Sequence, residues 1–369
     1  MTKIVLTGGP CAGKTSALPR IREEFEMAGY TVLTVPETAT ELIGGGVAPW
    51  TCGKRSDFQK CRLKLQIEKE KIYERAAGTM SGEKILIVCD RGALDTKCYS
   101  TDEEFDEALK LVGAGEVELR DSYDAVFHLV SAGSGALPDY STGDGTGRSE
   151  TPEESAELDN KLISAWCGHP HLRVIGCKES FDDKMSELIK EIKAFLGVPA
   201  PYEIERKYLI EYPDTEALSM DPFCKAARIE QIYLKCDVGV ERIRRRGANG
   251  DYLYYHTVKR RVSDMRRIEI ERKITKEEYE ELKLRADPSR APVEKTRYCL
   301  VYKNRYFEID VYPFSKERAI AEIELADERD TFEFPDSIRV IKEVTGDGSY
   351  SNSAIAKALK KKKDCGEII

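Results

Sequence analysis

The segment Glu203-Ile204-Glu205-Arg206-Lys207 carries charged side chains at every second position. Successive side chains of a β-strand point to opposite faces, so Glu203, Glu205 and Lys207 would share one face. Two carboxylates so close together need a neutralising cation or a hydrogen-bond donor. A bound metal ion is the simplest partner of this kind, and a solvated strand face is the alternative.

The segment from Gly8 to Thr15 reads G-G-P-C-A-G-K-T and fits the phosphate-binding pattern G-x-x-x-x-G-K-[ST] throughout. Gly8 and Gly13 let the backbone curl so that its N–H groups point at phosphate oxygens. Lys14 would reach the β- and γ-phosphates, and the Thr15 hydroxyl would ligate Mg²⁺. A strand expected at residues 4–7 and a helix at 16–28 flank this loop in the required order, which indicates a nucleotide site with ATP as the ligand.

Two further predicted strands end in carboxylates. Glu37 follows the strand at residues 31–35, where it could accept a proton from a substrate hydroxyl or simply cap a helix. Asp90 ends the apolar strand that begins at residue 84, a position from which a P-loop enzyme holds Mg²⁺, commonly through water. Arg91 and Asp95 follow at the same edge, where they would bind the acceptor or the transferred phosphate, or pair with each other.

The rest of this half predicts a helix at residues 54–77, strands at 124–130 and 172–175, a helix from about 151 and a closing helix at 181–196. A Gly-, Ser- and Asp-rich loop at 131–147 ends at Arg148. A loop that delivers an arginine over a transferring phosphoryl group is a recurrent feature of kinases, so Arg148 is predicted to act on the phosphoryl group.

Residues 1–197 resemble the P-loop kinase-like domains related to nicotinamide-riboside and deoxynucleoside kinases. The resemblance rests on G-G-P-C-A-G-K-T, on V-P-E-T-A at residues 35–39 and on C-D-R-G-A-L-D at residues 89–95. It implies an α/β P-loop domain with a parallel sheet and helices on both faces. A small-molecule kinase acceptor is expected but not identified, and an ATPase without such an acceptor is the alternative.

The segment at residues 198–201 contains two prolines and separates this domain from a β-rich domain at 202–369. There, seven strand-like segments each carry charge on one face, and the charge on each face is mostly of one sign. These patterned charges are Glu203, Glu205 and Lys207; Arg242, Arg244 and Arg246; Lys259; Glu269, Glu271 and Lys273; Lys295 and Arg297; Glu308 and Asp310; Glu322 and Glu324.

An ordinary half-exposed sheet would also alternate between polar and apolar residues. Strands of a single sign, however, would gain little from cross-strand pairing if water were their only neighbour. A closed barrel would instead place a basic wall opposite an acidic one. Arginine and lysine suit phosphate oxygens, whereas glutamate and aspartate suit Mg²⁺ or Mn²⁺, so the pattern predicts an interior site for a metal-bound polyphosphate.

Residues 202–357 resemble the CYTH superfamily, the triphosphate tunnel metalloenzymes, on the E-x-E-x-K segment and the charged strands that follow it. The resemblance implies an α+β domain built around an eight-stranded antiparallel β-barrel that binds a triphosphate and a divalent metal. It implies phosphate-binding roles for Lys207, Arg242, Arg244, Lys259, Lys295 and Arg297. It also implies metal ligation by Glu203, Glu205, Glu322 and Glu324, with Glu269, Glu271 and Asp310 orienting water or a second ion.

The composition of the chain disfavours some classes of protein function and location. The formal net charge of −8 disfavours a general nucleic-acid binder. No apolar run approaches membrane-spanning length, and the N-terminus lacks the layout of a signal peptide, so a cytoplasmic location is expected. The 11 cysteines contain no C-x-x-C pair and are expected to be reduced thiols. A helix at 350–363 ends in four lysines, which are expected to be a solvated helix end.

These observations predict a bifunctional enzyme: an ATP-binding kinase-like domain followed by a metal-dependent triphosphatase. The triphosphatase would release the terminal phosphate of a nucleoside triphosphate or of tripolyphosphate. One alternative is cyclisation of a nucleoside triphosphate, as in cyclases of the same superfamily. Another is a triphosphate sensor without turnover that regulates the P-loop domain. The sequence leaves the oligomeric state open.

Overall fold

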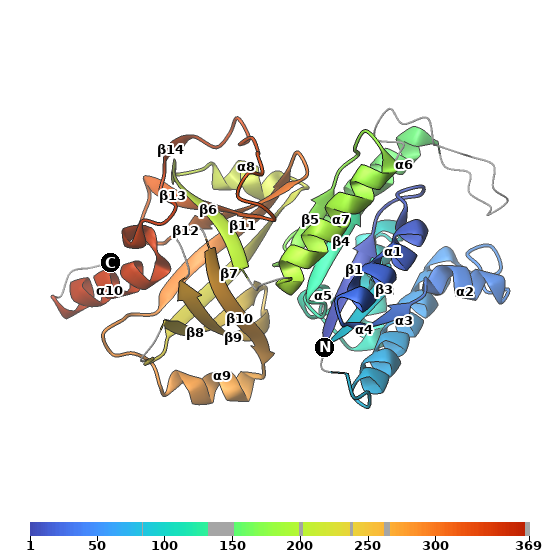
Figure 1. Ribbon diagram of the computed structural model, residues 1–369, viewed down its shortest axis with the longest axis horizontal. Helices are drawn as coiled ribbons and strands as arrows, with labels where there is room; N and C mark the ends of the chain where they lie inside the picture. The colour runs from blue at the N-terminus through green and yellow to red at the C-terminus, as the bar shows by residue number, and fades with distance from the viewer. Residues whose placement is uncertain (83, 132–150, 199–201, 237–238, 262–265, 366–369) are drawn as a thin grey trace. The chain divides into compact units, whose positions relative to one another are not determined.

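The computed structural model describes residues 1–82, 84–131, 151–198, 202–236, 239–261 and 266–365. The chain divides into two compact units, Met1–Ile189 and Lys190–Ile369 (Figure 1). The division falls inside helix α7 (Phe181–Leu196), just before the predicted linker, of which residues 199–201 lie outside the described ranges. The predicted domain limits at 197 and 202 therefore stay a prediction.

The first unit is built on a five-stranded parallel sheet in the order β2-β3-β1-β4-β5. β3 and β4 are buried along their whole length, which is why their sequences are continuous apolar runs. All five strands were predicted to within two residues at each end. They are β1 (Thr2–Thr7), β2 (Thr31–Val35), β3 (Ile85–Asp90), β4 (Ala125–Leu129) and β5 (Leu172–Ile175).

The helices predicted in this unit are present as α1 (Lys14–Met27), α3 (Arg55–Ala77), α6 (Pro152–Trp166) and α7. Sequence reasoning missed α2 (Thr38–Gly44), the 3₁₀ helix η1 (Ala93–Tyr99), α4 (Asp102–Val112) and α5 (Glu116–Arg120). A capping box was the available signal for α4, because the Thr101 hydroxyl accepts from the Glu104 N–H and the Glu104 carboxylate accepts from the Thr101 N–H.

The second unit contains a nine-stranded antiparallel sheet in the order β10-β9-β8-β7-β11-β12-β13-β6-β14. β10 also pairs with β6 through a three-residue ladder, so the order of pairing returns to β6. The strands are β6 (Tyr202–Glu211), β7 (Cys224–Tyr233), β8 (Val240–Ala248), β9 (Asp251–Arg261), β10 (Arg266–Ile274), β11 (Val293–Tyr302), β12 (Arg305–Val311), β13 (Arg318–Leu325) and β14 (Val340–Glu343).

The seven charged segments predicted as strands correspond to β6 and β8 to β13, whereas β7 and β14 were missed. The register pairs Ile229 with Lys295 and Gln231 with Arg244, so the β7 residues opposite these basic side chains are uncharged, and Lys225 is the one charged β7 residue on that face. Arg228 and Glu230 occupy the alternate positions and so lie on the other face. The pattern that revealed the other strands is therefore absent from β7.

Two apolar clusters support this sheet. Residues on the face opposite the charged one, such as Tyr208, Phe307 and Ile323, pack with Leu218 of α8 (Thr215–Met220). A second cluster joins one end of the charged face, including Leu209, to Ala356 and Leu359 of α10 (Asn352–Asp364). Helix α9 (Lys276–Lys283) and the 3₁₀ helix η3 (Gly348–Tyr350) complete the unit.

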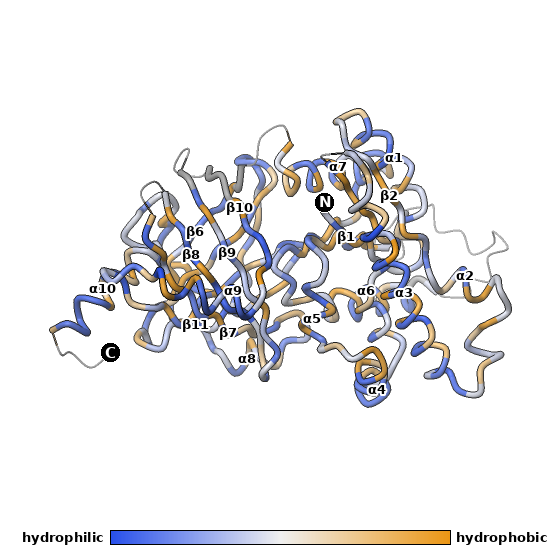
Figure 2. Tube along the Cα trace, turned by 90° about the horizontal axis from the view of Figure 1, so that it is seen from below, coloured by the Kyte–Doolittle hydropathy of each residue, from blue (hydrophilic) through white to orange (hydrophobic). Residues whose placement is uncertain are grey.

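Figure 2 shows hydrophilic and hydrophobic residues alternating along the strands of the second unit, and a hydrophilic end of α10. The predicted C-terminal helix is thus confirmed, and residues 361–363 of its lysine run are exposed. In the described part of the chain, no helix is both long and apolar enough to cross a membrane.

Candidate functional sites

The cross-strand register brings the charged residues of the second unit onto one continuous face. Residues directly paired in an antiparallel sheet project from the same side. Glu322 of β13 pairs with Lys207 of β6, and Glu324 pairs with Glu205. The other pairs on this face include Glu308 with Glu322, Asp310 with Arg297, Lys295 with Ile229, Gln231 with Arg244, Arg242 with Thr257, and Glu271 with Thr257.

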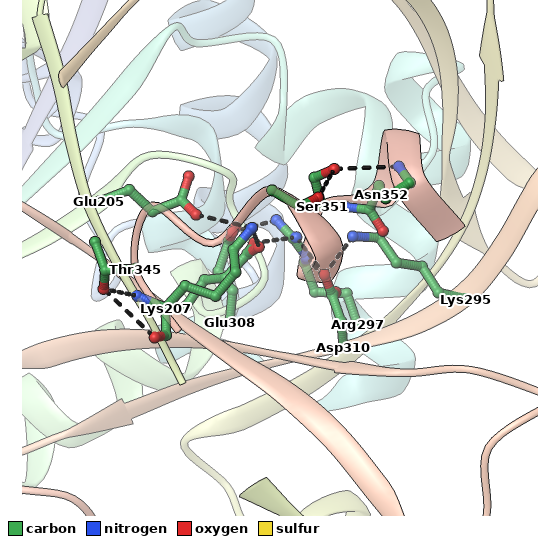
Figure 3. A network of polar contacts seen from close by, with 12 residues as sticks. Glu205, Lys207, Lys295, Arg297, Glu308, Asp310, Thr345, Ser351 and Asn352 are labelled. Carbon is green, nitrogen blue, oxygen red and sulfur yellow. Dashed lines mark hydrogen bonds and ion pairs between the residues drawn. The ribbon is translucent and has the colours of Figure 1, made fainter. Parts of the chain in front are cut away.

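Arg297 lies at the centre of the acidic part of this face (Figure 3). Its Nε and Nη2 donate to Asp310 Oδ1 and Oδ2, both at 2.7 Å, and Nη2 also donates to Glu322 Oε2 at 2.9 Å. Nη1 contacts Glu308, and Lys295 Nζ contacts Asp310. Asp310 is fully buried, so one carboxylate holds two cations away from water.

Lys207 extends this network toward the predicted metal ligands. Its Nζ lies 2.6 Å from Glu322 Oε1 and 3.2 Å from Glu205 Oε1. Figure 3 shows Lys207 and Glu205 pointing toward the group that contains Arg297 and Asp310. The structure thus brings together predicted metal ligands and predicted phosphate-binding cations from β6, β11, β12 and β13.

A second polar group lies on β8, β9 and β10. Arg244 Nη2 donates to both oxygens of Glu271, at 2.8 and 3.0 Å, and Thr257 Oγ1 donates to Glu271 Oε2 at 2.7 Å. Arg242 Nη1 donates to the neutral Gln231 Oε1 at 2.8 Å. Thr257 and Gln231 are buried participants that sequence reasoning missed, because an uncharged residue does not stand out in a charge pattern.

Burial and charge set the protonation of the central network. Burial, with Arg297 nearby, lowers the pKa of Lys295 to about 8. Burial alone would raise the pKa of Glu322, but Lys207 and Arg297 hold it well below its usual value. Burial would lower the pKa of Arg297, and the charges of Asp310 and Glu308 raise it. Glu322 is therefore ionised, and the Arg297 guanidinium keeps its proton.

Several predicted site residues lie where the structure does not describe their side chains. Arg148 is in the segment 132–150, and the side chains of Glu203 and Glu269 are also outside the described set. Lys259 lies on β9, half-buried. The roles predicted for these four residues stay predictions.

The arrangement of the predicted metal ligands fits a divalent metal ion only in part. Glu205 and Glu324 are directly opposed across β6 and β13, a like-charge pair that a cation would stabilise. Among the described side chains, however, no group of three Asp, Glu, His or Cys is arranged to hold a metal ion. Glu322, the third predicted ligand, instead accepts from Lys207 and Arg297. A metal would have to take the place of some of these cations.

The phosphate-binding loop of the first unit depends on its glycines. Gly8 has φ of 141°, and a Cβ there would lie 2.2 Å from the carbonyl oxygen of Leu129. Gly13 has φ of 92°, and its Cβ would lie 2.6 Å from the ring of Phe181. Any side chain at either position would therefore displace neighbouring atoms and strain the backbone.

Lys14 and Thr15 begin α1 directly after this loop. Lys14 Nζ donates to the carbonyls of Gly8 and Gly9, at 2.7 and 2.8 Å, and Thr15 is exposed. Burial, followed by the nearby charge of Arg91, lowers the pKa of Lys14 to about 7. An anion beside Lys14 would favour its charged form.

Asp90 ends β3 next to the loop, as predicted. It is buried, and its Oδ1 has no hydrogen-bond partner among the described residues. Burial raises its pKa. A buried carboxylate oxygen without a donor is a suitable position for the coordination sphere of Mg²⁺.

Glu37, Arg91 and Asp95 form one connected group. Arg91 Nε donates to Glu37 Oε1 at 2.6 Å, and its Nη1 lies 3.5 Å from Asp95 Oδ2. Glu37 also accepts from the Thr40 hydroxyl at 2.7 Å. Burial alone would raise the pKa of Glu37, but Arg91 and Thr40 bring it to about 2. In this arrangement Glu37 is a weak base, and its side chain makes no helix-capping hydrogen bond.

Asp159 and Lys184 hold the backbone of the phosphate-binding loop in place, and neither residue was predicted from the sequence. Asp159 Oδ1 accepts from the Gly9 N–H at 2.7 Å, and its Oδ2 accepts from the Ser131 N–H at 2.6 Å. Lys184 Nζ donates to the carbonyls of Ala12 and Val130, at 2.8 and 2.5 Å. An acidic residue on the apolar face of the predicted helix from 151 was the signal for Asp159.

One family model matches the N-terminal part of the chain. Residues 3–184 match the family model described as AAA domain. The first unit carries a P-loop domain. Among curated proteins, none matches the sequence.

Three solved structures illustrate what the chain is similar to. The inorganic triphosphatase NE1496 is 30% identical, over 42% of this chain and 94% of its own, with a TM-score of 0.30. HpAC1 from Hippeastrum, whose structure is titled as a putative adenylyl cyclase with a dominant triphosphatase activity, is 14% identical over 34% of this chain and 80% of its own, with a TM-score of 0.25. PH1012 from Pyrococcus horikoshii OT3 is 17% identical over 45% of this chain and 91% of its own, with a TM-score of 0.26.

Proposed function

We propose that residues 202–369 form a divalent-metal-dependent triphosphatase that hydrolyses the terminal phosphate of a nucleoside triphosphate or of tripolyphosphate. The observation that carries this proposal is the single charged face of the sheet, on which Lys207, Lys295 and Arg297 lie among Glu205, Glu322 and Asp310. A polyanion with a divalent cation would satisfy both signs of charge at once.

The β10–β6 ladder supports the further proposal that eight of these strands close into a barrel around the charged face. Closure would turn the face into an interior with low access to water, where charge interactions are stronger. Lys207, Arg242, Arg244, Lys259 and Lys295 would contact the phosphate oxygens. Arg297, whose donors are directed at three carboxylates, would mainly hold Asp310 and Glu322 in place.

Glu203, Glu205, Glu322 and Glu324 would hold Mg²⁺ or Mn²⁺. The bound ion would neutralise charge on the phosphoryl group and promote the attack of water. Glu271, held by Arg244 and Thr257, would orient water, as would Glu269.

The test uses the full-length chain, incubated with tripolyphosphate, ATP or other nucleoside triphosphates in Mg²⁺ or Mn²⁺, with identification of the products. Free phosphate is expected, whereas pyrophosphate with a cyclic nucleotide would indicate cyclisation, and binding without any product would indicate a sensor. Glu322→Gln in a Lys14→Ala background should reduce turnover at least about a hundredfold. The exposed Glu333→Gln is the matched control. Turnover that survives Glu322→Gln would contradict the proposal.

For the first unit, we propose an ATP-binding, kinase-like phosphotransfer domain in which Asp90 and Thr15 hold Mg²⁺ and Lys14 contacts the phosphates. The buried Asp90 Oδ1, which has no hydrogen-bond partner among the described residues, supports this proposal. Arg91 and Arg148 would act on the transferred phosphoryl group. Equilibrium binding of ATP with Mg²⁺ to the Glu322→Gln chain is the test, and Lys14→Ala should weaken it at least about tenfold. Equal binding by both chains would contradict this assignment.

A further inference from the structure

We propose that the first unit binds a small oxyanion-bearing acceptor, a phosphate monoester or a carboxylate, through the guanidinium of Arg62. The proposal rests on the kinase-like function proposed above, to which it adds the chemical class of the acceptor. Nothing in the sequence pattern singled out Arg62, because it lies within the long charged helix at residues 54–77.

The environment of Arg62 lacks an anion. Its relative exposure is 4%, yet among the described residues it has no carboxylate within ion-pair distance. Its contacts are a hydrogen bond from Nη1 to Gln59 Oε1 at 3.3 Å and a position 5.7 Å from the centre of the Tyr99 ring. An arginine side chain keeps its charge under all ordinary conditions, so this buried positive charge contacts neutral groups among the described residues.

Three other buried basic side chains of the same unit each have a carboxylate partner. Lys3 lies 3.1 Å from Glu70, Arg91 lies 2.6 Å from Glu37, and Arg120 lies 2.6 Å from Asp121. A buried cation without a counter-charge is costly, and proteins usually avoid it by pairing. Lys184 is equally buried and donates to two backbone carbonyls, whereas Arg62 makes one long hydrogen bond to an amide oxygen. The weaker compensation at Arg62 therefore points to an anion supplied by a ligand.

The face of α3 that carries Arg62 also contacts the chain directly after β3, next to Asp90. Gln59, Arg62 and Gln66 are spaced three and four residues apart, so they share one face of α3. At one end of this face, Gln66 Nε2 donates to the carbonyl of Arg91 at 3.3 Å. Arg91 is the residue that follows Asp90 in the chain. Tyr99 links the two guanidiniums: burial raises its pKa, and the charges of Arg91 and Arg62 oppose that rise.

The chemistry of this group limits its ligand. A guanidinium presents parallel N–H donors that match the two oxygens of a carboxylate or a phosphate. Gln59 adds an amide that can hydrogen-bond the same ligand, and the half-buried Tyr99 adds an aromatic face. A neutral acceptor would leave the Arg62 charge uncompensated, so it should bind more weakly than its anionic analogues.

The test compares the full-length chain with its Arg62→Met variant, both in a Lys14→Ala background that weakens phosphate binding at the P-loop. Calorimetric titration with inorganic phosphate and with acetate separates the two sources of the oxyanion. An Arg62-dependent binding event should appear and should weaken about tenfold or more in Arg62→Met. A response to phosphate alone would assign a phosphate monoester, and a response to acetate alone a carboxylate.

Unfolding of the ligand-free chains gives a second readout. Arg62→Met should leave the midpoint of unfolding unchanged or raised, because it removes an unpaired buried charge. Arg120→Met is the matched control and should lower the midpoint, because it leaves Asp121 buried without its partner. The inference is overturned if Arg62→Met lowers the midpoint as much as Arg120→Met does, or if anion binding is unchanged. ATP binding, measured with Lys14 intact, reports separately on the proposed function.

Discussion

At the scale of single residues, Asp310 organises the charged face of the second unit. It is fully buried and accepts from both Arg297 and Lys295. Removing one member of a buried ionic group leaves the others uncompensated, which costs more than the group contributes as a whole. The effect of a substitution here therefore depends on what remains behind.

Asp310→Asn should reduce the free energy of unfolding of the second unit by about 3–5 kcal/mol, because two buried cations lose their shared carboxylate. Glu308→Gln is the control: Glu308 also contacts Arg297, but its side chain is 23% exposed, so water can replace it. Denaturant unfolding of both variants checks the difference. Equal losses would show that Asp310 is no more important than a partly solvated partner.

Gly8→Ala should abolish nucleotide binding, because the new Cβ would lie 2.2 Å from the Leu129 carbonyl oxygen and φ is 141°. Gly44→Ala is the matched control, since no atom lies within 4 Å of its added Cβ. Binding of ATP with Mg²⁺ checks both. Retained binding in Gly8→Ala would mean that the loop adjusts without loss of its phosphate-binding shape.

At the scale of elements, the register of paired strands decides which charges meet. The predicted segments alone could not show that Glu322 lies opposite Lys207, or that Glu324 lies opposite Glu205. In the first unit, α6 has a comparable role. Its Asp159 ties the phosphate-binding loop at Gly9 to Ser131 at the end of β4, so a helix far along the chain fixes the shape of the loop.

Asp159 should make the first unit sensitive to acid. Burial alone would raise its pKa, but the His128 ring 3.3 Å away and the hydrogen bonds from Ser131 lower it from 3.8 to about 2. The resulting stabilisation, about 2 kcal/mol, is fully present above about pH 4 and is lost as the pH falls through about 2. Asp159→Asn should therefore flatten the dependence of unfolding free energy on pH in this range.

The exposed Asp182→Asn is the control for that measurement, because Asp182 is 77% exposed in its ion pair with Arg20. Unfolding of the three chains between pH 5 and pH 2 gives the comparison. A wild-type curve parallel to that of Asp159→Asn would show that Asp159 does not carry the acid sensitivity.

At the scale of the whole molecule, each unit contains a complete set of candidate residues. The described residues of the P-loop site all come from the first unit, and those of the charged face all come from the second. Each unit also has its own apolar core. This separation is the physical basis for treating the two proposed activities as independent.

Lys14→Ala should therefore leave tripolyphosphate turnover within about twofold of the wild-type rate, and Glu322→Gln should leave ATP binding to the first unit within the same limit. Steady-state phosphate release and equilibrium nucleotide binding check the two statements. A change of tenfold in either cross-measurement would instead favour the regulatory alternative, in which one unit senses a triphosphate and controls the other.

The sequence by itself determined the local features. A P-loop is formed by consecutive residues, so the sequence from Gly8 to Thr15 predicted it directly. The alternation of side chains along a strand predicted that Glu205 and Lys207 share a face. Buried apolar runs likewise gave all five strands of the first sheet. The helices α2, α4 and α5 were not predicted. The capping box at the start of α4 is a local sequence signal that would have predicted that helix.

Only the tertiary structure decided the partners. Contacts between Arg297 and Asp310, between Asp159 and Gly9, or between Glu37 and Arg91 join residues distant in the chain, and no local pattern encodes them. Strand β7 and the lack of a described carboxylate beside the buried Arg62 became visible only in the structure, for the same reason. Whether a charged side chain has a partner of opposite charge depends on which residues the fold brings next to it. The sequence gives the charged residues but not these spatial neighbours.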